Sequence, residues 1–314
     1  MTLPAADSRI HGLRPSRRYI DPFRAHGTVL ETERRPGDKL EHALTVFLAG
    51  AECPFACSFC DLWQWTIDGP TPPGAITAQL SHALQSLAEP LPDRIKLYNA
   101  SNFFDPRAVP TGDLDGLPDL LDSFEAVTVE SHASTINRRA VSFSQSIRGR
   151  LEVAIGLETI HALALAESNK RLQLSSFDRA VSFLLTHGID VRVFVLLGMP
   201  YVPAEEAVEW TVRSVEYAAQ RGATVVSIIP VRAGNGELER LESEGNFTRP
   251  TFLQLEQTLL ATQKTKSAVV TADLWDVDRL VTCKACRDER IDLLRTANIT
   301  GKMETRAVCG VCGE

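Results

Sequence analysis

Three cysteines in the first quarter of the chain have the residue type and spacing of iron–sulfur ligands. Cys53, Cys57 and Cys60 lie within eight positions of one another, and thiolates are the usual ligands of such clusters. Three thiolates can hold a [4Fe–4S] cluster and leave one iron open to an external molecule. The alternatives are buried free thiols or a zinc site, but structural zinc takes four ligands, and the nearest histidine, His42, is expected at the far end of the preceding strand.

A second group of cysteines lies near residue 300. Cys283, Cys286, Cys309 and Cys312 form the pattern C-x2-C-x22-C-x2-C. Four soft ligands in two pairs predict a tetrahedral metal site, either a structural zinc ribbon or an auxiliary [4Fe–4S] cluster. With cysteine at all four positions, an auxiliary cluster would have no open iron, which favours electron transfer over substrate binding. Two tight groups in a mid-sized chain indicate metal sites rather than a disulfide framework.

The composition is that of a globular protein with one large domain and a small appendage. The 314 residues are 44% hydrophobic and 23% charged, and the net charge of −7 argues against a strongly basic nucleic-acid surface. We recognise no secretory signal and no apolar run of about 20 residues, so we expect a cytoplasmic protein. We divide the chain into an N-terminal extension (1–40), a main domain (41–276) and a metal-binding segment (277–314).

The elements that must position the first cysteines alternate between β-rich and helical segments. Strands are predicted at residues 44–49, 94–98, 126–130, 151–157, 190–197 and 224–230. Helices are predicted at 75–87, 175–187 and 204–220. The strands are mostly apolar, as in parallel strands buried on both faces. Six such units predict an α/β fold, a partial (βα)6 TIM-like barrel, with its functional residues at the carboxyl ends of the strands.

The spacing C-x3-C-x2-C, with Phe59 directly before the last cysteine, resembles the signature of the radical S-adenosylmethionine (SAM) superfamily. The resemblance extends over about residues 42–275. It implies an enzyme whose [4Fe–4S] cluster binds SAM and cleaves it reductively to a 5′-deoxyadenosyl radical, which abstracts hydrogen from a substrate. It also implies a reductant such as a ferredoxin or flavodoxin.

The same resemblance implies a set of SAM contacts, for each of which packing, turn formation or surface exposure is the alternative. Phe59 is expected near the adenine. The turn after the second predicted strand lacks the family's glycine-rich form, but it carries three residues that can accept hydrogen bonds from the SAM ammonium. These residues are Asn99, Ser101 and Asn102. The other candidates are Glu130 and Glu158 at strand ends, Lys170 or Arg171 for the SAM carboxylate, and Arg232 at the mouth of the site.

Three segments, at 96–103, 129–131 and 152–159, are similar to one branch of this superfamily. The branch contains the radical SAM subunit of archaeosine synthase and, more distantly, the Elongator catalytic subunit, which both act on tRNA. A tRNA nucleoside is therefore one predicted substrate, and a small-molecule natural product, favoured by the acidic composition, is the alternative. The alternative of another class is a non-catalytic module with zinc at both cysteine groups.

Overall fold

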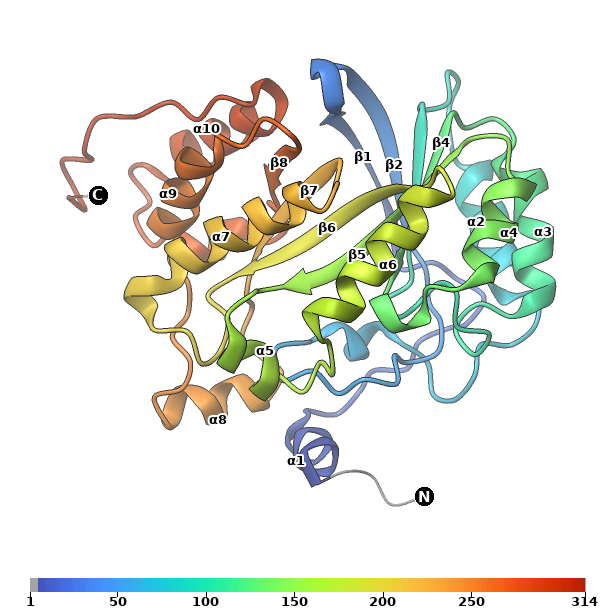
Figure 1. The fold of residues 1–314 in the computed structure, drawn as a ribbon, viewed down its shortest axis with the longest axis horizontal. Coiled ribbons are helices and arrows are strands. Elements are labelled where there is room, and N and C mark those ends of the chain that lie inside the picture. The colour runs from blue at the N-terminus through green and yellow to red at the C-terminus, as the bar shows by residue number, and fades with distance from the viewer. Residues whose placement is uncertain (1–4, 314) are drawn as a thin grey trace.

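Eight strands form the sheet at the centre of the computed structural model, which describes residues 5–313 (Figure 1). The strands lie in chain order, with β1 antiparallel to β2 and every later pair parallel. They are β1 (Gly27–Arg34), β2 (Leu40–Phe47), β3 (Arg94–Tyr98), β4 (Ala126–Ser131), β5 (Arg150–Glu158), β6 (Asp190–Leu197), β7 (Val225–Pro230) and β8 (Val269–Ala272). The predicted α/β barrel-like fold is confirmed, and each of the six predicted strands is present.

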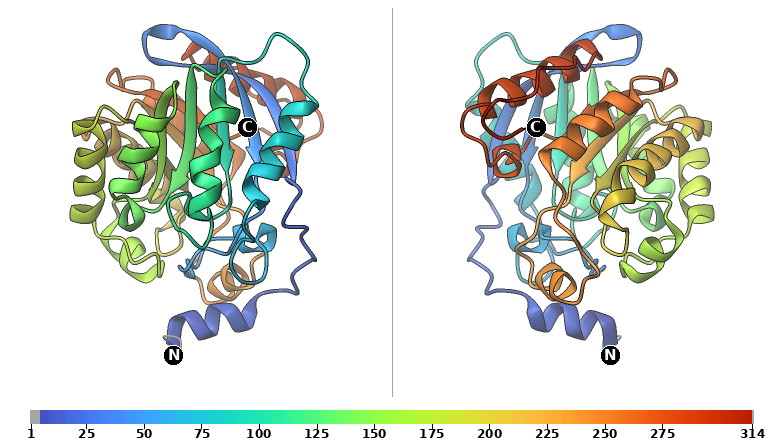
Figure 2. Two further views of the ribbon diagram at one scale, coloured as in Figure 1. Left: turned by 90° about the vertical axis from the view of Figure 1, so that its right-hand side faces the viewer. Right: turned by 90° about the vertical axis from the view of Figure 1, so that its left-hand side faces the viewer.

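Helices surround this curved sheet, and most of them cover its outer face, whereas the N-terminal helix lies beyond one end of the strands (Figure 2). They are α1 (Ala5–Leu13), α2 (Ala75–Gln85), α3 (Thr111–Leu121), α4 (Arg138–Ser146), α5 (Ala162–Glu167), α6 (Leu174–Thr186), α7 (Ala207–Gln220), α8 (Glu237–Ser243), α9 (Phe252–Thr262) and α10 (Arg287–Thr300). The three predicted helices correspond to α2, α6 and α7, the last preceded by a 3-10 turn at Ala204–Glu206. Among the described residues, no helix is long and apolar enough to cross a membrane.

Two strands were not predicted, and their sequences explain why. β1, with the sequence GTVLETER, is largely exposed at the sheet edge, so it lacks the apolar character of a central strand. β8 has only four residues, too few for a clear pattern. The observed sheet therefore has eight strands, two more than the sequence predicts.

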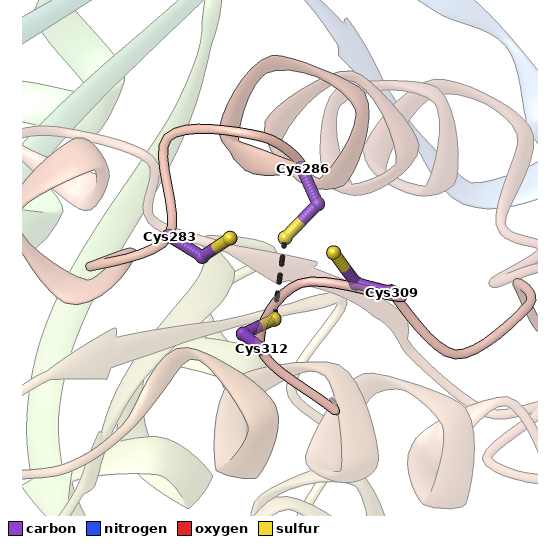
Figure 3. A group of neighbouring side chains, drawn as sticks. All are labelled: Cys283, Cys286, Cys309 and Cys312. Carbon is purple, nitrogen blue, oxygen red and sulfur yellow. Dashed lines mark hydrogen bonds between the residues drawn. The ribbon is translucent and has the colours of Figure 1, made fainter.

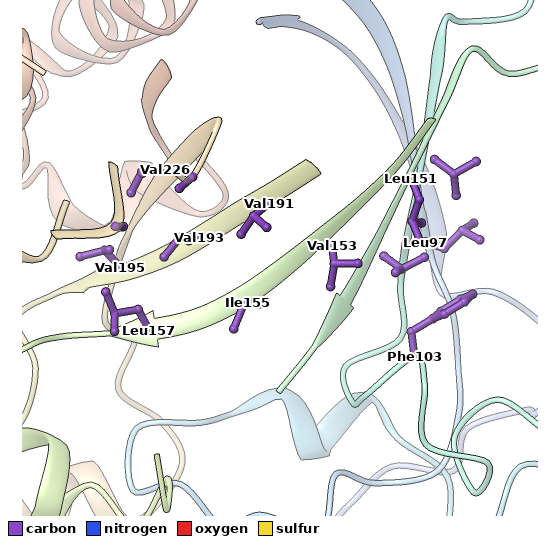
Figure 4. Close-up of a cluster of buried hydrophobic side chains, with 14 of the residues drawn as sticks. Leu97, Phe103, Leu151, Val153, Ile155, Leu157, Val191, Val193, Val195 and Val226 are labelled. Atoms are coloured by element: carbon purple, nitrogen blue, oxygen red, sulfur yellow. The ribbon is translucent and has the colours of Figure 1, made fainter. Parts of the chain in front are cut away.

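The two faces of the parallel strands have opposite character, because successive side chains point to opposite sides. Outward-facing residues pack against the helices in one apolar core, which includes Leu97, Val153, Ile155, Val193 and Val226 (Figure 4). The prediction that both faces are apolar is wrong for the inner face.

The inner face carries a buried network of charges near the amino ends of the strands. Glu152 on β5 is fully buried, and it accepts hydrogen bonds from Arg192 at 2.8 Å and from Arg35. Glu33 on β1 binds Arg192 at 2.7 Å and Lys96 at 2.6 Å. These cations lower the pKa of both carboxyl groups against the opposing effect of burial. Paired charges therefore fill the inner space where a closed barrel would carry apolar layers.

Helix α10 covers the seam between β1 and β8, which are the two edges of the sheet and do not pair with each other. The Asn298 side chain donates to the carbonyl of Ala272 and accepts from its N–H, both at 2.8 Å. Across the seam, Arg34 of β1 lies against Gly301, where an added Cβ would come within 2.6 Å of the guanidinium. The seam is thus closed by a helix instead of a strand pair.

Candidate active site at the carboxyl ends of the strands

The loop that carries Cys53, Cys57 and Cys60 follows β2 and is held by residues distant in the sequence. The Asn235 amide donates to the carbonyls of Ser58 at 2.9 Å and Cys60 at 3.2 Å. The Asn169 amide donates to the carbonyl of Ala56 at 2.7 Å. These bonds fix the loop over the carboxyl ends of the strands, where the sequence predicts the functional residues.

The three thiols lie in surroundings that disfavour free thiolates. Burial raises the pKa of Cys53, of Cys57 to about 12, and of Cys60. The positive charge of Lys170 opposes this effect at Cys53 and Cys57, and the Asn102 amide lies 3.3 Å from the Cys53 sulfur. A bound cation or cluster would supply the positive charge that three buried thiolates require.

A buried ion pair lies beside these cysteines. Lys170 Nζ donates to Glu158 Oε1 at 2.6 Å, and both residues are 7% exposed. Glu158 ends β5 with φ +66°, a conformation that costs a non-glycine residue about 1–3 kcal/mol. Gly156 makes room for the pair, because an added Cβ would clash with the Glu158 carboxylate. The ammonium also lies 5.9 Å from the Phe59 ring centroid, so three of the predicted contact residues lie together.

The turn after β3 presents polar atoms that have no partner among the described residues. Both amide atoms of Asn99, which is 0% exposed, and the hydroxyl of Ser101 make no hydrogen bond. Glu130 lies under this turn, and its carboxylate accepts from the Ala100 N–H at 2.7 Å. Burial raises the pKa of Glu130 to about 7. Glu130 thus supports the turn, and Asn99 is free to bind a ligand.

His132 is a further polar residue of this region, and it directly follows β4. Its ring stacks on Phe55 at 4.1 Å, and its backbone N–H donates to Asn102 Oδ1 at 2.7 Å. Its buried Nε2 has no partner within residues 5–313, and burial lowers the pKa of the imidazole to about 3. The signal in the sequence was its place directly after β4.

The two predicted arginines point to other partners. Arg171 Nη2 binds Asp7 of α1 at 2.6 Å, whereas the adjacent Lys170 faces the cysteines. Arg232 Nη2 binds Asp273 at 2.5 Å and the Trp275 carbonyl at 3.1 Å. Of the residues predicted to meet the SAM carboxylate, only Lys170 has its charge among the cysteines.

The donor set fits a cluster with SAM. The buried Cys57 and the half-buried Cys53 and Cys60 supply thiolates. Lys170 supplies a cation for a carboxylate. Asn99 and His132 supply buried polar atoms that no residue in the described part of the chain satisfies, and such atoms cost about 1–3 kcal/mol each when unpaired. A small polar ligand that fills the space beside these residues would remove that cost.

Exposed aromatic rings line the seam side of this region, and we call them the aromatic rim: His26, Phe47, Trp65 and Trp275. His26 packs edge-on to Trp65 at 5.5 Å and donates its backbone N–H to the Phe47 carbonyl at 2.8 Å. The Phe47 and Trp275 rings lie 5.3 Å apart. Trp65 and Trp275 are 47% and 54% exposed, so the rim can stack on a planar ring.

The second cysteine group is also assembled. The sulfur atoms of Cys283, Cys286, Cys309 and Cys312 all lie within 4.8 Å of one another and point to a common centre (Figure 3). Within residues 5–313 this is the one set of three or more cysteine, histidine or acidic side chains gathered as a single ion requires. The described thiols of Cys53, Cys57 and Cys60 do not form such a set.

Solved structures share this fold. A radical SAM methyltransferase from Sphaerobacter thermophilus matches 88% of this chain and 84% of its own, with 15% identity and a TM-score of 0.53. Methylornithine synthase matches 71% of this chain and 62% of its own, with 13% identity and a TM-score of 0.51. This chain therefore shares the fold of these two proteins, and its cysteine motif lies on the loop after the first parallel strand.

A protein of similar sequence adds to this similarity in fold. Archaeosine synthase subunit beta of Methanosarcina acetivorans is 25% identical over 277 residues, which cover 82% of this chain and 78% of that protein. The branch resemblance predicted from the three short segments is thereby confirmed. No family model matches the chain.

Proposed function

We propose that this protein is a radical SAM enzyme with its active site at the loop of Cys53, Cys57 and Cys60. The observation that carries the proposal is the meeting of the cysteine loop, in which Cys57 is buried and Cys53 and Cys60 are half-buried, with the charge of Lys170 and the unpartnered amide of Asn99. When bound, a [4Fe–4S] cluster would supply the electron that cleaves SAM into methionine and a 5′-deoxyadenosyl radical.

The residues of the chain then have separate roles. The three cysteines hold the cluster, and Lys170, positioned by Glu158, binds the SAM carboxylate. Asn99 and the turn around it receive the SAM ammonium, and Glu130 holds that turn in place. Phe59 packs near the adenine and helps to exclude water from the radical.

For the substrate we favour a nucleoside in tRNA. The support is the similarity to archaeosine synthase subunit beta and the exposed aromatic rim, since nucleobases of RNA stack on aromatic side chains. A small-molecule substrate is the second candidate, favoured by the net charge of −7. Tight binding of tRNA that weakens steeply with salt would support the first candidate.

Anaerobic reconstitution tests the proposed chemistry. Wild-type protein should take up about four irons at this loop and form 5′-deoxyadenosine from SAM upon reduction. Cys57→Ser should abolish both, and the exposed Cys312→Ser, as a matched control, should leave this iron and the product in place. Reconstituted protein that binds no iron at residues 53–60 would refute the proposal.

A further inference from the structure

The spacing of the C-terminal sulfurs separates the two kinds of metal site that the sequence left open. The sulfurs of Cys286 and Cys312 lie 3.8 Å apart, and all four lie within 4.8 Å of one another. Four thiolates around one zinc ion, at about 2.3 Å each in a tetrahedron, lie about 3.8 Å from one another. The observed spacing is therefore that of ligands to one ion.

A [4Fe–4S] cluster would need a wider arrangement. Its four thiolates bind four different irons at the corners of the cube, so the sulfurs lie farther apart than ligands that share one ion. Opening this group would require the two turns to move apart. The Gly313 N–H donates to the Cys309 carbonyl at 2.9 Å and closes one turn. In the other turn Cys286 is the N-cap of α10, and its carbonyl accepts from the Arg290 N–H at 3.0 Å.

The surroundings of the four cysteines favour the binding of a cation. The Val311 N–H lies 3.5 Å from the Cys309 sulfur. Cys286 is 3% exposed, and Cys312 lies at the surface. An ion can therefore enter from solvent and be held on its inner side by a fixed ligand.

We propose that Cys283, Cys286, Cys309 and Cys312 bind one tetrahedral zinc ion, which fastens the C-terminal segment to the start of α10. The four sulfurs complete the coordination of the ion, so the site is structural. This site lies outside the proposed radical chemistry and does not depend on it.

The proposed ion would connect the C-terminal segment to the rest of the fold. The segment that carries Cys309 and Cys312 has no helix or strand of its own. Along this segment, the Met303 carbonyl accepts from the Gln263 amide at 2.9 Å. The ion would join the end of this segment to the same α10 that closes the seam through Asn298. Loss of the ion should therefore loosen the seam between β1 and β8.

Metal and sulfide analysis of anaerobically prepared protein tests this assignment. We expect about one zinc per chain in the wild type and in the variant Cys53→Ala/Cys57→Ala/Cys60→Ala, and a loss of that zinc in Cys309→Ser/Cys312→Ser. Hydrogen exchange in α10 should become faster in the latter variant. Iron with acid-labile sulfide in the triple variant would overturn the assignment, as would mononuclear iron in place of zinc.

Cobalt substitution covers the case in which the double variant does not fold. Wild-type protein grown with Co²⁺ should show the intense visible absorption of a tetrahedral tetrathiolate site, and the triple variant should show the same spectrum. A spectrum of six-coordinate Co²⁺ would contradict the proposed site. Failure of the radical chemistry alone would remove iron and 5′-deoxyadenosine but leave zinc and cobalt binding intact, so the two proposals fail separately.

Discussion

Among single residues, Glu158 and Lys170 form an ion pair that positions a charge at the site but costs free energy to bury. The pair is buried, and Glu158 has a left-handed backbone conformation. Neither charge can reach bulk water without leaving its partner unpaired. Their mutual bond therefore keeps the Lys170 charge beside the cysteines.

Removing one charge of this pair should lower the stability of the protein far more than removing both charges. We expect Lys170→Met to lower the free energy of unfolding by about 3–5 kcal/mol, because a buried carboxylate is left without a cation. The double variant Lys170→Met/Glu158→Gln should regain most of that loss. Urea unfolding of the apo protein measures both, and a loss below about 1 kcal/mol in the single variant would mean that water reaches Glu158.

Glu130 should make stability depend on pH. Its pKa is raised from 4.5 to about 7, so the folded state holds a proton that the unfolded state releases, and stability decreases as the pH rises between those values. We expect the stability advantage of wild type over Glu130→Gln to shrink by about 3 kcal/mol from pH 4.5 to pH 7.5. Parallel urea titrations check this, and an advantage that grows with pH would contradict the shift.

Among the elements, helix α1 has a larger part in the site than its place in a polar extension suggests. Asp7 is 3% exposed, accepts from Asn169 at 2.8 Å and binds Arg171. The same Asn169 amide holds the carbonyl of Ala56 in the cysteine loop. The N-terminal helix is therefore linked to the cysteines through one side chain.

Loss of this link should loosen the cysteine loop. In Asp7→Ala we expect peptides over residues 52–60 to exchange amide hydrogens faster than in the wild type, because Asn169 loses its second partner. Arg9→Ala is the matched control, since Arg9 lies on the same helix but binds Glu237 and is half-exposed. Equal exchange in both variants would exclude a role for α1 in holding the loop.

At the scale of the whole molecule, the charged interior of the open barrel determines how the protein responds to acid. Glu152 and Glu33 have lowered pKa values because of Arg192 and its neighbours. For a lowered carboxyl pKa, the stabilisation is present above about pH 4.5 and is lost as the pH falls below it. The charge network of the inner face therefore stabilises the protein more at neutral pH than at acidic pH.

Neutralising the centre of this network should be strongly destabilising. We expect Glu152→Gln to cost about 3–5 kcal/mol at pH 7, because buried Arg35 would lose its nearest carboxylate and Arg192 would keep only Glu33. Glu125→Gln, at an exposed position, should cost less than about 1 kcal/mol. Thermal unfolding at pH 7 compares the two, and similar midpoints would show that the network contributes little.

The sequence by itself determined the two cysteine groups, the six central strands and the edge of the sheet at which the site lies. These follow from patterns within a few residues, namely the spacing of thiols and runs of apolar side chains. It also placed Asn99, Glu130 and Glu158 at strand ends, where the structure has them.

Only the tertiary structure decided which side chains face the cysteines and how the barrel is closed. Lys170 and Arg171 are neighbours of the same charge, and their directions depend on Glu158 and Asp7, the latter more than 160 positions away. The seam is closed by α10 because β1 and β8, the two edge strands, do not pair with each other. Such choices depend on contacts between distant segments, which no local pattern records.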